Sequence, residues 1–221
     1  MSKRKYFVNL LHHSSKRNYL KRMSNQKVKG MQIASKYGFD YWDGNRSYGY
    51  GGYKYIPGRW RGVAKKLIKN YSLNNNSKIL DVGCGKAYLL HELKLLLPEI
   101  KIYGFDISNY AISKSKDTVK KNLFVFNANK KFPYKNKKFD LVISLATLHN
   151  LNIDGLFSSI KEIERVAKKK YIMVESYTNL KELFNLQCWA LTCKSFFSVN
   201  DWQWIFKTNK YKGDFEFICF K

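Results

Sequence analysis

The sequence contains 221 residues, with 41 lysines and arginines against 16 aspartates and glutamates, so its formal net charge is +25. Its hydrophobic fraction of 45% and aromatic fraction of 16% exclude a disordered chain and indicate a globular protein of one large domain, or of one domain with an extension. No stretch has the length and apolar character of a membrane helix or a signal peptide. We therefore expect a soluble, cytoplasmic protein without a membrane span.

The positive charge is mostly lysine, because only seven of the 41 basic residues are arginines. Lysines spread over a surface are most simply explained as solvated side chains, so we expect no specific nucleic-acid partner. Residues 1–36 stand out, since they contain ten basic residues and no acidic one. Such an arm can attract phosphates or form a simple tail, and the sequence leaves both interpretations open.

The four cysteines, Cys84, Cys188, Cys193 and Cys219, include no Cys-x-x-Cys pair. This spacing argues against a zinc ribbon and against a thioredoxin-like redox centre. We expect reduced thiols and no metal site.

The first third of the chain has two distinct compositions. Residues 15–36 have a basic, helical pattern, whereas residues 37–60 contain six of the 16 tyrosines and six of the 13 glycines. Glycine at this density opposes both helix and regular strand, which predicts a long structured loop before a helix over residues 63–71. We assign residues 1–77 to an N-terminal extension in which residues 37–60 form a lid, and we expect residues 1–14 not to be needed to cover the sheet.

From residue 78 onward, short apolar strands alternate with helices. Strands are expected at 79–82, 101–105, 123–126, 139–144 and 171–174, and helices at 87–97, 108–120 and 154–168, the last two capped by Ser108 and Asp154. This alternation predicts an α/β core, residues 78–221, around a doubly wound, mostly parallel sheet of six or seven strands. Helices near 180–191 and 200–207 then precede a final strand at 214–220, which we expect to be antiparallel.

A glycine loop follows the first expected strand, in Ile79-Leu80-Asp81-Val82-Gly83-Cys84-Gly85-Lys86-Ala87-Tyr88. Glycines between a strand and a helix let the backbone approach a ligand near the free N–H groups of the helix. The dinucleotide fingerprint requires a small residue where Tyr88 stands, so that cofactor class is disfavoured. A carboxylate at Asp81 suits instead a cofactor that carries an ammonium and a sulfonium group.

Asp106 ends the second expected strand, 21 residues after Gly85. An acidic side chain at this place can accept hydrogen bonds from both hydroxyls of a ribose. The alternative is a structural role as a cap for the helix that begins near Ser108.

The segment Ile79 to Ala87, followed by Gly104-Phe105-Asp106, resembles the class I S-adenosylmethionine-dependent methyltransferases over residues 78–221. The resemblance implies S-adenosylmethionine as cofactor. Asn127 stands where that family commonly has an aspartate that contacts the adenine. The residues that we expect to bind the cofactor are Asp81, Gly83, Gly85, Ala87, Asp106, Ile107, Asn127, Ala128 and Ser144.

The front half of the chain is similar to a set of small methyltransferases of bacterial surface-polysaccharide pathways. The similarity lies in Asp40 to Gly44, Tyr48 to Tyr53 and Arg59-Trp60, together with Thr147 to Asn150 and Val174 to Tyr177. It implies a sugar, sugar phosphate or nucleotide sugar as acceptor. Arg46, Arg59 and Arg61 cluster in this region, which favours an anionic acceptor. The residues that we expect to bind it are Arg46, Tyr50, Tyr53, Arg59 and Tyr177.

Two side chains are candidates for acid–base chemistry at the carboxyl edge of the sheet. His149 follows the fourth expected strand and can act as a base or orient the acceptor, or can simply close a turn. Glu175, at the end of the fifth strand, is the second candidate, and its alternative is a salt bridge to a lysine.

Two other functions stay open at this point. The charge of +25 favours an RNA methyltransferase, although Ser144-Leu145-Ala146-Thr147 is not the box of adenine-amino methylases and no cysteine lies there to attack a pyrimidine. A non-enzymatic binding module with the same fold is the other, and the intact Asp81, Gly83, Gly85 and Asp106 argue against it.

Overall fold

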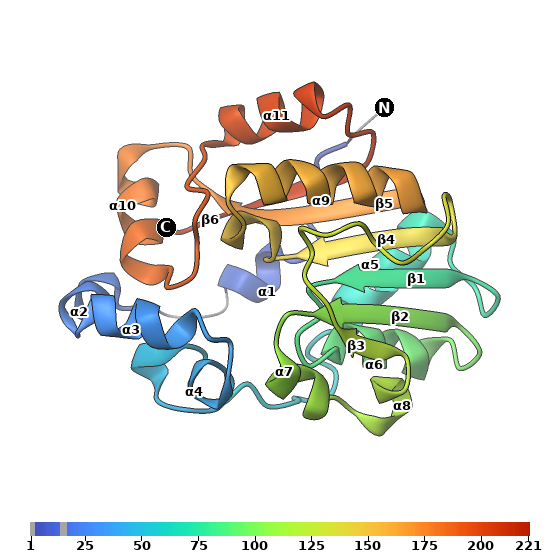
Figure 1. The fold of residues 1–221 in the computed structure, drawn as a ribbon, viewed down its shortest axis with the longest axis horizontal. Helices are drawn as coiled ribbons and strands as arrows, with labels where there is room; N and C mark the ends of the chain where they lie inside the picture. The colour runs from blue at the N-terminus through green and yellow to red at the C-terminus, as the bar shows by residue number, and fades with distance from the viewer. Residues whose placement is uncertain (1–2, 14–16) are drawn as a thin grey trace.

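A computed structural model describes residues 3–13 and 17–221. Within that part, six parallel strands form one sheet with the order β3-β2-β1-β4-β5-β6 (Figure 1). The strands are β1 (Lys78–Val82), β2 (Lys101–Asp106), β3 (Leu123–Val125), β4 (Phe139–Leu145), β5 (Ala167–Ser176) and β6 (Asp214–Cys219). The order reverses between β1 and β4, which confirms the predicted doubly wound α/β fold and places a ligand crevice at the carboxyl ends of these strands.

The last strand is parallel to its neighbour, and the expectation of an antiparallel strand was wrong. Tyr171 pairs with Asp214 and Ser176 pairs with Cys219, so both strands run in one direction. Two helices, α10 (Leu180–Trp189) and α11 (Val199–Thr208), lie between β5 and β6. They return the chain to the amino end of the sheet, which is the condition for a parallel pair.

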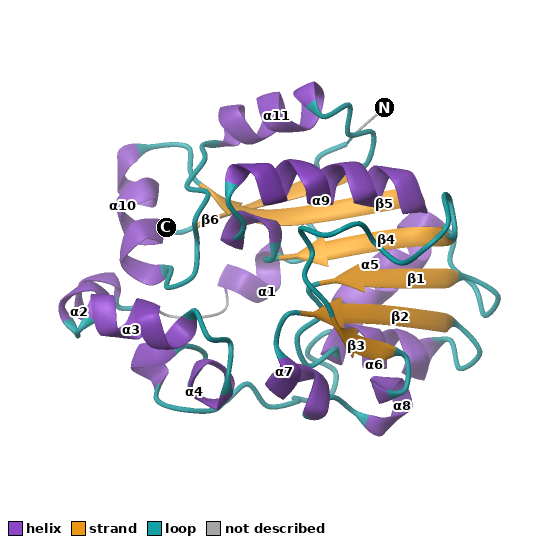
Figure 2. Cartoon of the chain, in the orientation of Figure 1, coloured by secondary structure: helices purple, strands orange, loops and turns teal. Residues whose placement is uncertain are grey.

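Helices cover both faces of the sheet (Figure 2). One face packs against α5 (Arg61–Tyr71) and α6 (Tyr88–Leu96), and the other against α9 (Ile153–Val166) and α11. Strand residues are apolar on both faces, as a parallel sheet between two helical layers requires. No helix in the described ranges is long and apolar enough to cross a membrane.

Two predicted helices differ in detail from the observed ones. The expected helix over residues 108–120 is divided into α7 (Asn109–Ser113) and α8 (Asp117–Lys120). Ser108 does cap α7, because its hydroxyl accepts from the Ala111 N–H at 3.0 Å. Asp154 is not a cap: Asn152 holds that position for α9, and Asp154 lies in the first turn.

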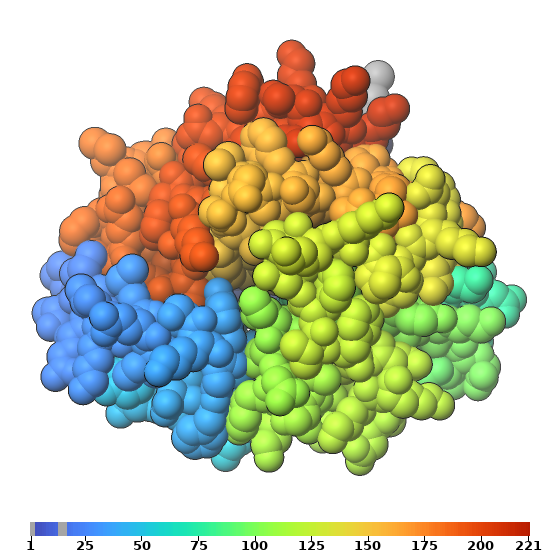
Figure 3. All heavy atoms as spheres, viewed as in Figure 1, coloured from blue at the N-terminus to red at the C-terminus, as the bar shows by residue number. Residues whose placement is uncertain are grey.

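The middle of the N-terminal extension, from α1 (Asn9–His13) to residue 60, gathers at the carboxyl ends of the strands, beside α10 (Figure 1). It contains α1, α2 (Tyr19–Ser24), α3 (Lys27–Ala34), α4 (Phe39–Trp42) and a 3₁₀ turn over Arg46–Tyr48. The expected helical segment 15–36 is thus two helices, with residues 14–16 outside the described part. In the space-filling view the extension, in blue, abuts the orange segment around α10 (Figure 3).

The first described residues belong to the core, so the expectation that residues 1–14 are not needed to cover the sheet was wrong. Phe7 and Val8 are buried in the same cluster as the sheet residues. Backbone N–H groups of Phe7, Val8 and Asn9 donate to the fully buried Glu216 carboxylate at 2.6, 3.0 and 2.7 Å. These charge-assisted bonds fix the first described residues to β6.

Candidate functional site

The two glycines of the loop after β1 adopt backbone conformations that favour glycine. Gly83 and Gly85 have φ of 77° and 55°, in the left-handed region. A Cβ at Gly83 would lie 2.1 Å from Thr147 Oγ1, and one at Gly85 would lie 2.7 Å from the Trp42 ring. Side chains are therefore excluded at both positions, because Thr147 and Trp42 pack directly against the loop backbone.

Asp106 connects this loop to the next strand–helix junction. Its carboxylate accepts from the Gly85 and Ser108 N–H groups, each at 2.8 Å, and burial raises its pKa. The helix cap of α7 is supplied by Ser108 itself, so Asp106 shapes the loop rather than capping a helix.

Asp81 is buried behind the loop with an unusual electrostatic environment. Among the residues that the structure describes, its Oδ1 atom has no hydrogen-bond partner. Burial, with a smaller effect of Asp106, raises the pKa of its carboxyl to about 8. An orphaned carboxylate oxygen of this kind fits a ligand that brings N–H donors and positive charge, as the ammonium of S-adenosylmethionine does.

A cavity of about 200 Å³, here called the glycine-loop chamber, lies at the carboxyl ends of β1, β2 and β4. Among the residues expected to bind the cofactor, those that line it are Gly83, Asp106, Ile107, Asn127 and Ala128. The sequence reasoning missed Tyr37, Trp42, Thr147 and Lys194, which line it as well.

Four of the expected cofactor contacts, Asp81, Gly85, Ala87 and Ser144, do not line this chamber. Ala87 is buried at the N-terminus of α6. Ser144 is fully buried, and its hydroxyl donates to the Val82 carbonyl at 3.0 Å, which joins β4 to β1. Ala87 and Ser144 thus stabilise the loop and the sheet around the chamber.

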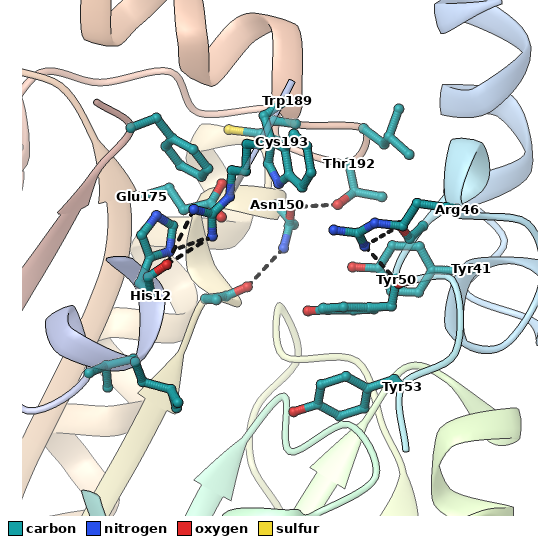
Figure 4. Close-up of a pocket in the computed structure, with 18 of the residues that line it drawn as sticks. His12, Tyr41, Arg46, Tyr50, Tyr53, Asn150, Glu175, Trp189, Thr192 and Cys193 are labelled. Carbon is teal, nitrogen blue, oxygen red and sulfur yellow. Dashed lines mark hydrogen bonds between the residues drawn. The ribbon is translucent and has the colours of Figure 1, made fainter. Parts of the chain in front are cut away.

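A second cavity of about 440 Å³, here called the arginine chamber, adjoins the first. The two share Tyr41, Tyr50, Ala146 and Asn150 as lining residues, so a group in one can reach a group in the other. Of the residues expected for catalysis and acceptor binding, those that line it are Arg46, Tyr50, Tyr53, Arg59, His149 and Glu175. Figure 4 shows this chamber.

Two residues that the sequence associated with the acceptor, Tyr177 and Arg61, do not line the arginine chamber. Tyr177 is absent from the lining; it pairs through its backbone with Ser198 and packs against the core. Arg61 donates from Nε to the fully buried Glu92 carboxylate at 3.0 Å, so it fixes the start of α5 rather than facing the chamber.

His149 and Glu175 form a pair at the wall of the arginine chamber. The Glu175 N–H donates to His149 Nδ1 at 3.2 Å, so the ring proton lies on Nε2, 3.4 Å from Glu175 Oε2. Burial lowers the pKa of His149 to about 3 and raises that of Glu175 to about 7, an effect that Arg17 partly opposes. The imidazole is therefore neutral and turned toward Glu175, whereas the carboxyl is balanced between its two protonation states near neutral pH.

Three guanidinium groups surround the indole of Trp189. Arg17, Arg22 and Arg46 lie 5.3, 5.0 and 5.0 Å from its ring centre. Arg17 and Arg22 come from the N-terminal arm and were missed by the sequence reasoning. The sequence did contain a signal for them. Only seven of the 41 basic residues are arginines, so an arginine in place of a lysine indicates a position where the guanidinium group itself is needed.

The tyrosine- and glycine-rich segment covers both chambers and is fastened at two points. Lys86 Nζ donates to both Asp43 oxygens at 2.7 Å, and Tyr110 donates to the same carboxylate at 2.7 Å. The Trp42 indole donates to Ser108 Oγ at 2.9 Å. These bonds hold the segment against the loops that form the glycine-loop chamber.

Comparison with known proteins gives a family match. A model of the methyltransferase domain matches residues 73–216. The chain is 34% identical over 112 residues to the ribosomal RNA small subunit methyltransferase C of Buchnera aphidicola subsp. Acyrthosiphon pisum, covering 48% of this chain and 32% of that protein. It is 28% identical over 152 residues to the malonyl-[acyl-carrier protein] O-methyltransferase of Bacillus anthracis, covering 61% of this chain and 54% of that protein.

The fold has counterparts among solved structures. The geranyl diphosphate C-methyltransferase of Streptomyces coelicolor A3(2), in a complex that contains S-adenosyl-L-homocysteine, superimposes with a TM-score of 0.54 at 11% identity, covering 66% of this chain and 59% of that chain. The present chain spans about a third to a half of the curated relatives described above. It belongs to the methyltransferase-domain family, and its sheet has the class I methyltransferase fold.

Proposed function

We propose that this methyltransferase transfers a methyl group to a hydroxyl of a small, anionic, carbohydrate-related acceptor: a sugar, sugar phosphate or nucleotide sugar. The observation that carries the proposal is the arginine chamber, which adjoins the glycine-loop chamber and combines a perturbed carboxylate with several arginines. An arginine-lined cavity suits a small anion, because guanidinium groups match the geometry of phosphate and carboxylate oxygens.

The glycine-loop chamber fits the cofactor. We assign the ammonium to Asp81, whose Oδ1 has no partner among the described residues. We assign the ribose hydroxyls to Asp106 and the adenine to Asn127, which both line the chamber. When bound, S-adenosylmethionine supplies an electrophilic methyl group and a thioether leaving group. The chain contributes position, since holding the reacting atoms in line provides most of the rate enhancement that such a displacement needs.

Glu175 is the proton acceptor in this proposal. A carboxyl with a pKa of about 7 is well matched to take a proton from the acceptor hydroxyl as the new C–O bond forms. His149 acts as a positioning residue, because both of its nitrogens face Glu175. Tyr50 and Tyr53 line the same chamber and would exclude water from the reacting groups.

RNA is the second candidate acceptor, favoured by the charge of +25 and by the ribosomal RNA methyltransferase among the relatives. A lysine-lined hollow does exist, with Lys168 and Lys170 at the amino end of β5 and Lys212 just before β6. That end of the sheet is opposite the carboxyl ends that carry both chambers, so RNA bound there would not reach Glu175. The small acceptor is therefore the better-supported proposal.

The test is a screen with methyl-labelled S-adenosylmethionine against nucleotide sugars, sugar phosphates, neutral sugars and bulk RNA. We expect label in a small anionic acceptor, with little in neutral sugars. Label transferred only to RNA would overturn the proposal. The Glu99→Gln variant, altered at an exposed glutamate, is the control and should label the same acceptor as the wild type.

A further inference from the structure

The corner of the arginine chamber around Trp189 concentrates positive charge from three separate segments. Arg17 follows α1, Arg22 lies on α2, and Arg46 lies in the lid, yet all three guanidinium carbons come within 5.3 Å of one indole centre. Glu175 is the one carboxylate among the described residues that line this chamber. Charge in this corner is therefore unbalanced.

The pKa values of these three arginines agree with an excess of positive charge in this corner. Burial, followed by repulsion from Arg46, lowers the pKa of Arg22 to about 10, and burial lowers that of Arg17 and Arg46. Their hydrogen bonds include several to backbone carbonyls, from Arg22 to Trp189 at 3.4 Å and from Arg46 to Gly49 and Tyr50 at 3.0 and 2.7 Å. Carbonyls fix the orientation of the guanidinium groups but add no negative charge, so a bound anion would stabilise the cluster.

We propose that the Trp189 corner is a phosphoryl-binding subsite, so that the acceptor is a phosphorylated small molecule whose phosphoryl group contacts Arg17, Arg22 and Arg46. This inference rests on the proposed function and narrows its acceptor class. A phosphoryl group presents three terminal oxygens and up to two negative charges, which matches three guanidinium groups better than the single charge of a carboxylate does.

The position of the subsite relative to Glu175 gives the acceptor its orientation. In Figure 4, Glu175 and Arg46 lie on opposite sides of the cavity, with Trp189 near the top of the view. The chamber volume of about 440 Å³ leaves room for a ring between the phosphoryl group and the hydroxyl that is methylated. A phosphoryl group held from the Arg46 side does not react, and it leaves a hydroxyl of the same acceptor to extend across the cavity toward Glu175 (Figure 4).

The first test measures anion binding without turnover. Calorimetry on the full chain saturated with S-adenosylhomocysteine should show that inorganic phosphate binds at least about tenfold more tightly than acetate at equal ionic strength. Arg46→Gln should weaken phosphate binding at least about tenfold, whereas Arg4→Gln, which removes an exposed arginine, should leave it within about twofold. Equal affinity for phosphate and acetate, or equal behaviour of the two variants, would overturn the subsite.

Arg46 also supports the lid, so the Arg17→Gln variant provides a second, independent removal of one guanidinium. The expected result is again at least about tenfold weaker phosphate binding, with unchanged affinity for S-adenosylhomocysteine. A competition arm distinguishes the source of the phosphate: a sugar phosphate should displace inorganic phosphate, and displacement only by RNA would overturn the small-molecule assignment. If phosphate fails to bind while a phosphate-free acceptor is still methylated in a Glu175-dependent reaction, the subsite is wrong and the proposed function stands.

Discussion

The two chambers differ in how the chain builds them. The glycine-loop chamber is formed largely by strand ends and the loops that follow them, around Gly83, Asp106 and Asn127. The arginine chamber is assembled from segments that are far apart in sequence, from Val8 near the start to Phe220 near the end. A cofactor common to a family can be bound by a local motif, whereas an acceptor site specific to one chain depends on how distant segments pack.

That difference explains what the sequence could predict. The alternation of strands and helices, the glycine loop and Asp106 follow from local rules, and the structure confirms the fold they predict. The direction of β6 was missed, because strand pairing depends on where α10 and α11 lead the chain. Arg17 and Arg22 were missed for the same reason: their sequence context shows a basic arm, and only tertiary packing brings them to Trp189.

The largest effect is expected for Glu175→Gln, which should impair the function of the arginine chamber and leave that of the glycine-loop chamber unchanged. We expect turnover to fall by about a hundredfold or more, because an amide cannot accept the proton of the acceptor hydroxyl. Affinity for S-adenosylhomocysteine, measured by calorimetry, should change by less than about twofold. The matched control is Glu99→Gln at an exposed position.

The pH dependence of turnover checks the same assignment. The ionised form of Glu175 is the base, and its raised pKa of about 7 means that turnover should increase as the pH rises through 7. His149→Ala should lower turnover at least about tenfold and shift this profile, since the imidazole contacts the carboxyl. A His149→Ala enzyme with normal turnover and an unchanged profile would show that the histidine only closes a turn.

Glu216→Ala tests whether the N-terminal arm is part of the core. The substitution leaves three backbone N–H groups without their carboxylate, and we expect the free energy of unfolding to fall by about 3 kcal/mol. Urea denaturation monitored by circular dichroism measures the change, with Glu99→Ala as the control. A loss below about 0.5 kcal/mol would mean that the arm is not fixed by this residue.

Asp106→Ala should damage the glycine-loop chamber alone. The carboxylate holds the Gly85 N–H and lines the chamber, so we expect S-adenosylhomocysteine to bind at least about tenfold more weakly. Phosphate affinity should stay within about twofold, and the exposed Asp154→Ala variant should behave like the wild type. Unchanged cofactor affinity in Asp106→Ala would contradict the cofactor assignment for this residue.

The lid is expected to give the smallest effect. Residues 48–55 are glycine-rich and fastened through Asp43, so bound S-adenosylhomocysteine should slow their hydrogen exchange more than that of residues 214–220. Asp43→Asn should speed exchange in the lid without ligand, because it weakens the ion pair with Lys86. Equal exchange with and without ligand would identify a permanent wall instead of a closing lid.

The two adjacent chambers should bind two different ligands at once. Calorimetric titration of inorganic phosphate into the chain, free and then saturated with S-adenosylhomocysteine, tests this most directly. We expect one phosphate per chain in both titrations, with Kd values within about threefold of each other. Phosphate binding that disappears when S-adenosylhomocysteine is bound would contradict it, because the two ligands would then occupy one site.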